Sequence, residues 1–390
     1  MLRARFNYNE KITPLFIIYL VRTILALVPL ISLPLFLRIL GPSQWTQLTL
    51  FQMFGAVLGL LVDLAWSVDG HGKINQNRNL IRMVQIQKYM MFFLIIVITL
   101  PLAYYFRESV DLVSWLGMLW IASMSLSNWW HALALGTIKR FTMIELLPRI
   151  IPVLSLLLFV KSKGDICRYL ITFIFLNVVF CWNRNIEVRN NLSFYQILTS
   201  IFPRLKLVLW RILQSSYYLF GLPILTVISP SNCFTYALVE RVYRFSMTAT
   251  LPLQDYLILR PPMGNKFFSS WKAMTLFQTL FSCMVFLLLS SPVIFSSLIG
   301  TNNPSYALTI CFFLLVSFVA VNRVLVVQFT KKTFLSKNLN KPYLVSAVIF
   351  LATVFPLTYF AGSYGVVCSS VLAEMAFFMQ LRRNIASQQP

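Results

Sequence analysis

The sequence predicts an all-α integral membrane protein with twelve transmembrane helices in two six-helix bundles. Of its 390 residues, 58% are hydrophobic and only 11% are charged, and the mean hydropathy is +0.75, which is far from the composition of a soluble globular protein. Apolar runs of about 20 residues, enough to cross ~30 Å of hydrocarbon, recur along the whole chain. The two halves also share a sequence pattern, which predicts a pseudo-twofold axis along the membrane normal.

Twelve apolar runs define the predicted helices. The first carries Arg22 and ends at a Gly41-Pro42-Ser43 turn, and the second runs to Asp63. The segment 184–206 is the longest polar stretch; we expect it to be a cytoplasmic linker whose interior forms an interfacial amphipathic helix. It divides the chain into an N-terminal bundle at 1–183 and a C-terminal bundle at 207–390. The runs lie at 13–40, 45–66, 83–106, 111–137, 142–160, 167–183, 205–228, 232–256, 273–298, 305–330, 342–360 and 362–381.

The net charge of +22 is typical of nucleic-acid-binding proteins, but the positions of the charges argue against that partner. With the N-terminus inside, 22 of the 33 cations fall in cytoplasmic segments, Lys88 and Arg204 among them. The opposite side holds five, namely Arg38, Arg107, Lys161, Lys163 and Arg168. This is the positive-inside pattern, which predicts both termini in the cytoplasm.

The two halves align at an offset of 188 residues. Residues 40–53 (LGPSQWTQLTLFQM) and 228–241 (ISPSNCFTYALVER) share Pro-Ser, a residue with a side-chain amide and then an apolar run. One residue away from that offset, Arg22 corresponds to Arg211 and Pro34 to Pro223. We infer that the chain arose by duplication of a six-span unit, both copies having the same orientation in the membrane.

Enzyme chemistry has little support in the sequence. The two histidines, His71 and His131, have no partner at metal-ligand or triad spacing, and no P-loop is present. The six cysteines are scattered and form no CxxC pair, so neither a zinc site nor a disulfide framework is indicated. We expect no metal, no cofactor and no catalytic residue.

Six arginines lie within the predicted spans, where a charge is costly unless it faces a polar interior: Arg22, Arg149, Arg211, Arg241, Arg244 and Arg323. In the eighth span, Glu240, Arg241 and Arg244 fall within one helical arc of roughly 100°. Because the guanidinium fork binds phosphate and carboxylate groups bidentately, we interpret the six as substrate-binding candidates around an internal cavity. The alternative is that their side chains reach to lipid headgroups, above all those of Arg149 and Arg323.

Three carboxylates are candidates for ion coupling: Asp63, Glu240 and Glu374. Glu374 has no cation on its own predicted span, which would suit coupling to a proton or sodium gradient. Acidic residues within spans can instead be counter-ions, and Glu240 is best explained as the counter-ion of Arg244, just as Glu145 could balance Arg149.

Four segments carry a family resemblance. Tyr19-Leu20-Val21-Arg22, Leu40-Gly41-Pro42-Ser43, Leu61-Val62-Asp63 and Val239-Glu240-Arg241-Val242-Tyr243-Arg244, in this order and spacing, resemble Wzx-type O-antigen flippases. These belong to the superfamily that includes multidrug and toxin extruders (MATE) and lipid II flippases. The resemblance implies a MATE-like fold with two bundles in a V and alternating access. The outer turn departs from the family pattern at Gln44-Trp45-Thr46, and Asp63 is followed by Leu-Ala where the family has a glycine-aromatic pair.

The resemblance also implies a substrate, an undecaprenyl-pyrophosphate-linked oligosaccharide moved from the cytoplasmic to the periplasmic leaflet of the bacterial inner membrane. The arginines would hold its pyrophosphate, and polymerase and chain-length proteins of the same pathway are possible partners. Two alternatives stay open. One is a drug-extruding antiporter of the same superfamily, and the other is a membrane polymerase or glycosyltransferase, which would need a large external loop that the predicted spans do not leave.

Overall fold

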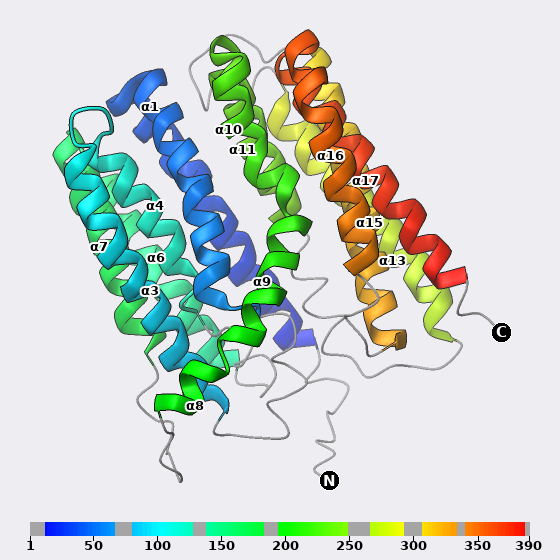
Figure 1. The fold of residues 1–390 in the computed structure, drawn as a ribbon, viewed down its shortest axis with the longest axis horizontal. Helices are drawn as coiled ribbons and strands as arrows, with labels where there is room; N and C mark the ends of the chain where they lie inside the picture. The colour runs from blue at the N-terminus through cyan, green and yellow to red at the C-terminus, as the bar shows by residue number, and fades with distance from the viewer. Residues whose placement is uncertain are drawn as a thin grey trace.

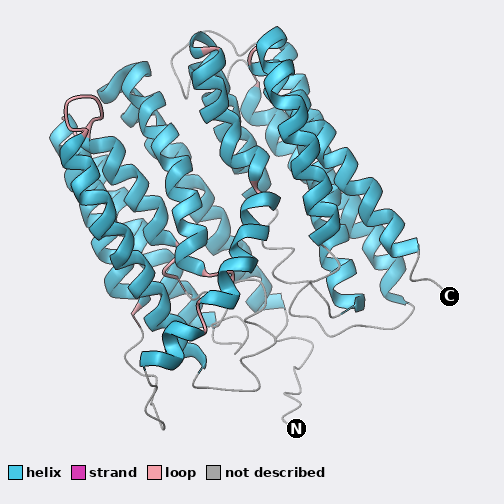
Figure 2. Ribbon diagram, in the orientation of Figure 1, coloured by secondary structure: helices cyan, strands magenta, loops and turns pink. Residues whose placement is uncertain are grey.

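The computed structural model describes residues 12–66, 80–127, 138–182, 194–248, 266–291, 306–333 and 340–386. Within these ranges all regular structure is helical and no strand occurs, as Figure 2 shows. Every predicted span coincides, in whole or in part, with a described helix. The prediction of an all-α protein is therefore confirmed.

Helix α1 (Ile12–Asp63) contains the first two predicted spans. Its two arms meet at Gly41, where the backbone turns to φ 72° and ψ 170°, a conformation that only glycine adopts readily. The chain therefore rises through the first arm, reverses at the predicted Gly41-Pro42-Ser43 turn and descends through the second (Figure 1).

The remaining helices of the N-terminal half are α3 (Leu80–Tyr105), α4 (Leu112–Met124), α6 (Ile138–Phe159) and α7 (Lys163–Cys181). They pack on one another and on α1. Helix α4 ends at Met124, well before the predicted end of its span at residue 137, because its last turn is capped at Ser125. Residues 128–137 lie outside the described part of the chain.

The C-terminal half contains α10 (Ser216–Ile228), the short 3-10 helix η2 (Pro230–Asn232), α11 (Cys233–Thr248), α13 (Lys266–Ser290), α15 (Tyr306–Thr333), α16 (Asn340–Ala361) and α17 (Ser363–Ala386). These helices form a second group (Figure 1). The start of α1 and the end of α17 lie at the same end of the molecule, as an even number of spans requires. We call this the inner end, and the end with the Gly41 turn the outer end.

Six helical segments in the described residues are long and apolar enough to cross a membrane: Ser32–Asp63, Leu80–Tyr105, Lys163–Cys181, Tyr306–Val326, Lys341–Ala361 and Ser363–Asn384. Three shorter apolar helices accompany them. Their outward faces are apolar; on α3, for example, Phe93, Val97 and Leu100 are exposed. Exposed apolar faces on several long helices are what contact with lipid requires, so the chain is a multi-pass membrane protein.

Two short helices connect the halves at the inner end. Helix α8 (Phe194–Thr199) lies in the predicted linker, and α9 (Phe202–Gln214) begins before the predicted linker end at residue 206. The Gln87 amide of α3 donates to the Ile197 carbonyl at 3.0 Å and accepts from the Trp66 indole at 3.0 Å. The Arg204 guanidinium stacks over the Trp66 ring at 3.2 Å. Helix α8 is therefore packed against the N-terminal half, while α9 contacts α1 of that half and α16 of the other. Arg204, which the charge pattern counts as a cytoplasmic cation, is buried.

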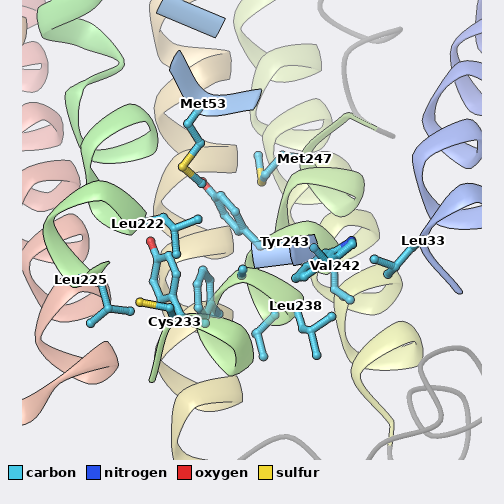
Figure 3. Packing of buried hydrophobic residues seen from close by; sticks show 14 of the residues in the cluster. Leu33, Met53, Leu222, Leu225, Cys233, Leu238, Val242, Tyr243 and Met247 are labelled. Carbon is cyan, nitrogen blue, oxygen red and sulfur yellow. The ribbon is translucent and has the colours of Figure 1, made fainter. Parts of the chain in front are cut away.

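The two halves share one hydrophobic core through α1 and α11. At the outer end, the buried Trp45 of α1 packs edge-on against Phe234 of α11, with 5.8 Å between ring centroids. Further along α11, Val242 and Tyr243 are buried among side chains of several helices, with Leu33 and Met53 of α1 nearby (Figure 3). The halves are thus joined along these two helices.

Candidate functional site

Helix α11 presents three charged side chains to the junction of the two halves. Glu240, Arg241 and Arg244 lie on one arc of the helix, as predicted, while Val242 and Tyr243 turn into the hydrophobic core. Because one side of α11 is held by this packing, the charged side faces α1 and α4.

Arg244 and Glu240 form an ion pair along the helix. The Arg244 Nε and Nη2 atoms donate to Glu240 Oε1 at 3.0 and 2.7 Å. The carboxylate is 4% exposed and the guanidinium 36% exposed. The structure therefore supports the interpretation of Glu240 as a counter-ion, and the Arg244 side chain is partly exposed.

Arg241 has different partners. Its Nη2 atom donates to the Gln52 side-chain carbonyl and, at 3.4 Å, to the Thr49 hydroxyl, both on α1. These partners are neutral, and among the described residues no carboxylate lies within ion-pair distance of Arg241. The two guanidinium groups and the one carboxylate leave the site with a net positive charge.

A cavity of about 50 Å³ lies between these groups. It is lined by Thr49, Gln52, Met53 and Ala56 of α1, Ile121 of α4, and Glu240, Arg241 and Arg244 of α11. Applying the 188-residue offset places Gln52, Met53 and Ala56 opposite Glu240, Arg241 and Arg244. Positions 188 residues apart thus face one cavity, with neutral side chains from one half and charged ones from the other. Gln52 and Thr49 are missing from the sequence prediction, although the repeat would have pointed to Gln52.

The other predicted arginines lie elsewhere. Arg149 Nη1 pairs with Glu145 Oε2 at 3.1 Å within α6, apart from the cavity. Arg211 is half-buried on α9 and does not line the cavity. Arg22 lies on α1 and Arg323 on α15, but their side chains are outside the described part of the structure. The structure thus brings together only two of the six arginines, Arg241 and Arg244.

A second polar cluster lies inside the N-terminal half. Lys88 of α3, with a fully buried side chain, pairs with Asp63 at 2.8 Å and donates to the Ser125 and Ser127 carbonyls at 3.0 Å each. The Ser127 hydroxyl in turn donates to Glu145. The charge pattern counts Lys88 among the cytoplasmic cations, but the structure buries it between helices. Asp63, predicted as an ion-coupling residue, is its counter-ion.

Glu374, the third ion-coupling candidate, lies in the C-terminal half. It is buried on α17, and the Asn322 side chain of α15 donates to its carboxylate and, at 2.9 Å, to its backbone carbonyl. This carboxylate does not line the cavity. A cluster of metal-ligating side chains does not occur in the described residues.

Solved structures with the same architecture are transporters. An inward-facing MATE multidrug transporter of the MOP superfamily aligns with a TM-score of 0.61 and 14% identity, covering 95% of this chain and 94% of the other. The lipid II flippase MurJ in an inward closed conformation aligns with a TM-score of 0.56 and 11% sequence identity, covering 96% of this chain and 87% of the other. A MOP superfamily transporter from Pyrococcus furiosus aligns with a TM-score of 0.57 and 12% sequence identity, covering 96% of this chain and 94% of the other; it is described as having a binding pocket of reversed polarity. The chain has the MATE-like fold.

This fold agrees with the two bundles predicted from the sequence. No family model and no curated protein matches the chain, so the likeness is one of architecture. Within that architecture the cavity lies where one bundle meets the other, with α1 and α4 on one side and α11 on the other.

Proposed function

We propose that this protein is a flippase that moves a lipid-linked oligosaccharide across the membrane. The observation that carries the proposal is the net positive cavity at the junction of the two bundles, with Arg241 held by neutral groups only. A guanidinium with no carboxylate partner in a low-dielectric site attracts an anion, and its planar geometry suits phosphate oxygens. The lipid tail of such a substrate can stay in the bilayer while its headgroup passes between the bundles.

The substrate that the sequence resemblance implies fits this site. An undecaprenyl-pyrophosphate-linked O-antigen or polysaccharide unit carries its negative charge at the junction of lipid and sugar. It would move from the cytoplasmic to the periplasmic leaflet of the bacterial inner membrane, with both termini of the protein in the cytoplasm. Similarity in architecture to MurJ, a lipid II flippase, supports a lipid-linked substrate. Polymerase and chain-length proteins would then act on the product.

The test compares charge variants in cells that depend on this protein for surface polysaccharide. Arg241→Ala and Arg241→Gln should reduce surface polysaccharide at least tenfold, because the variants remove the unpaired positive charge, and lipid-linked sugar should accumulate in the inner leaflet. Arg168→Ala is the matched control, because Arg168 lies on α7 with its side chain 84% exposed. Protein amount in the membrane is measured for each variant.

Arg244 needs a paired variant. Arg244→Ala alone removes the cation that pairs with the buried Glu240 and is expected to reduce folding. The double variant Glu240→Gln with Arg244→Gln removes both charges, so it tests the Arg244 charge without that penalty. Normal polysaccharide in both the Arg241 variants and this double variant would contradict the proposal.

A multidrug antiporter remains the second candidate, favoured by the architecture shared with MATE multidrug transporters. A net positive cavity repels cationic drugs. Drug accumulation that rises when the protein is deleted, with surface polysaccharide unchanged, would favour this second function.

A further inference from the structure

Arg241 links the two halves of the molecule at the cavity. Its hydrogen bonds run from α11 in one half to Gln52 and Thr49 of α1 in the other. Arg244, by contrast, is held by Glu240 on its own helix. Movement of α11 away from α1 would therefore break the bonds of Arg241 and leave the pair of Arg244 intact.

The groups that hold Arg241 are ones that an anion can replace. A neutral amide or hydroxyl accepts a hydrogen bond from the guanidinium but does not neutralise its charge, whereas a charged oxygen does both and can also bind it bidentately. In the alignment of the two halves at an offset of 188 residues, Gln52 corresponds to Glu240. The N-terminal half therefore has an amide at the position where the C-terminal half has a carboxylate. A carboxylate at position 52 would neutralise Arg241, whereas Gln52 orients it and leaves its charge for a ligand.

We propose that Gln52 is a positioning residue that holds Arg241 as a latch between the halves, and that the anionic group of the substrate releases it. Phosphate oxygens entering the cavity take over the guanidinium, its bonds to Gln52 and Thr49 break, and α11 is free to separate from α1. The ligand shifts this equilibrium because it binds the released state of Arg241 more tightly than the latched state. This inference rests on the proposed function, since it requires an anion at the site.

Binding by the purified full-length protein in nanodiscs provides the first measurement. The probes are inorganic pyrophosphate and farnesyl pyrophosphate, with uncharged farnesol as the control ligand. Gln52→Leu retains the approximate size of the side chain and removes the hydrogen-bond acceptor. Because Gln52 then no longer competes with the ligand for Arg241, this variant should bind both pyrophosphates about tenfold more tightly. Gln52→Glu should bind them at least tenfold more weakly. Gln47→Leu is the control, because Gln47 lies on the same helix but donates to Ser109 within its own half, at 3.3 Å.

The second measurement is the distance between spin labels on the two halves. If Gln52 had only a structural role, its replacement would not change how this distance responds to ligand. Spin labels are placed at two exposed residues of the outer end, Ser43 beside the turn of α1 and Ser231 in η2, in a chain whose six cysteines are replaced by serine. Pyrophosphate should add a longer-distance population in the wild type. Gln52→Leu should show that population without ligand, and Gln52→Glu should lack it even with ligand. A label pair at Ser43 and Glu108, both in the N-terminal half, should not change.

The outcomes separate the two proposals. If the wild-type protein binds neither pyrophosphate nor farnesyl pyrophosphate, the anion site and the proposed function are both rejected. If it binds them, but Gln52→Leu matches the wild type in affinity and in label distance, the latch is rejected and the anion site stands. If Gln52→Leu does not purify as a single species, Gln52→Met provides the same comparison.

Discussion

At the scale of single residues, Lys88 shows how one buried cation can organise the inside of a bundle. Its ammonium group has three hydrogen-bond donors, and the structure supplies three acceptors: the Asp63 carboxylate and the carbonyls of Ser125 and Ser127. Ser125 is the C-cap of α4 and Ser127 lies just beyond it, at a helix end where carbonyls lack partners along the chain. Lys88 therefore joins α1, α3 and α4.

Replacing Lys88 should destabilise the protein strongly. In Lys88→Met, Asp63 loses its ion pair with the buried ammonium group and the two carbonyls lose a donor, so we expect the free energy of unfolding to fall by about 3 kcal/mol, measured as a lower Tm in detergent. Lys163→Met is the matched control, because Lys163 pairs with Asp111 at the exposed outer end and should lose no more than about 1 kcal/mol. Adding Asp63→Asn to Lys88→Met should recover part of the loss; an unchanged Tm in Lys88→Met would contradict this role.

At the scale of elements, α1 depends on its turn at Gly41. The backbone conformation there lies in a region that is costly for residues with a side chain, while the space around the glycine is open. The second arm of α1 then packs closely on α4, where Gly55 and Gly59 let the helices approach, since a Cβ at Gly55 would overlap the Met118 carbonyl. The turn therefore determines where Thr49 and Gln52 stand relative to α11.

Gly41→Ala isolates the cost of this turn. Since a methyl group at Gly41 meets nothing within 4 Å, the change should act through the backbone alone and lower stability by about 1–3 kcal/mol. Gly164→Ala, in the first turn of α7, has no positive φ and should leave the Tm unchanged or raise it slightly. Equal Tm values for the two variants would show that the Gly41 conformation is not a source of strain for alanine.

At the scale of the whole molecule, the packing of Trp45 against Phe234 joins the halves at the outer end. It lies at the end opposite α8 and α9, which connect the halves along the chain. A transporter that works by alternating access must separate these two rings to open outward. The Arg241 bonds to α1 would resist the same movement deeper in the molecule.

Trp45→Ala should favour the outward-open state. Removal of the large side chain takes away the contact with Phe234 of the other half, which is part of the roughly 3 kcal/mol that a buried tryptophan contributes in all. Spin labels at Ser43 and Ser231 should therefore show a longer-distance population without any ligand. Trp120→Ala is the control, because Trp120 packs on Tyr169 and Phe173 within the N-terminal half and should lower the Tm without lengthening that distance. If Trp45→Ala leaves the distance unchanged, this contact does not hold the halves together.

Some features of the site could be predicted because they depend on local sequence. The arc formed by Glu240, Arg241 and Arg244 follows from helical spacing, and the pair of Glu240 with Arg244 follows from an i,i+4 separation. The reversal at Gly41-Pro42-Ser43 follows from glycine and proline between two apolar runs. The burial of Lys88 could not be predicted. The sequence pattern places a lysine near the end of an apolar run at the membrane interface, and its buried partners lie on other helices.

The sequence by itself determined that this is an all-helical, multi-pass membrane protein with charged groups inside, because apolar length, hydropathy and helical period are local properties of the chain. Only the tertiary structure decided which charges share a site. Arg241 meets Gln52 although 189 positions separate them, and Arg149 joins Glu145 and Ser127 in a different cluster. The physical reason is that a side chain's partners depend on which helices pack together and in which rotation, and the pattern of one helix does not contain that information.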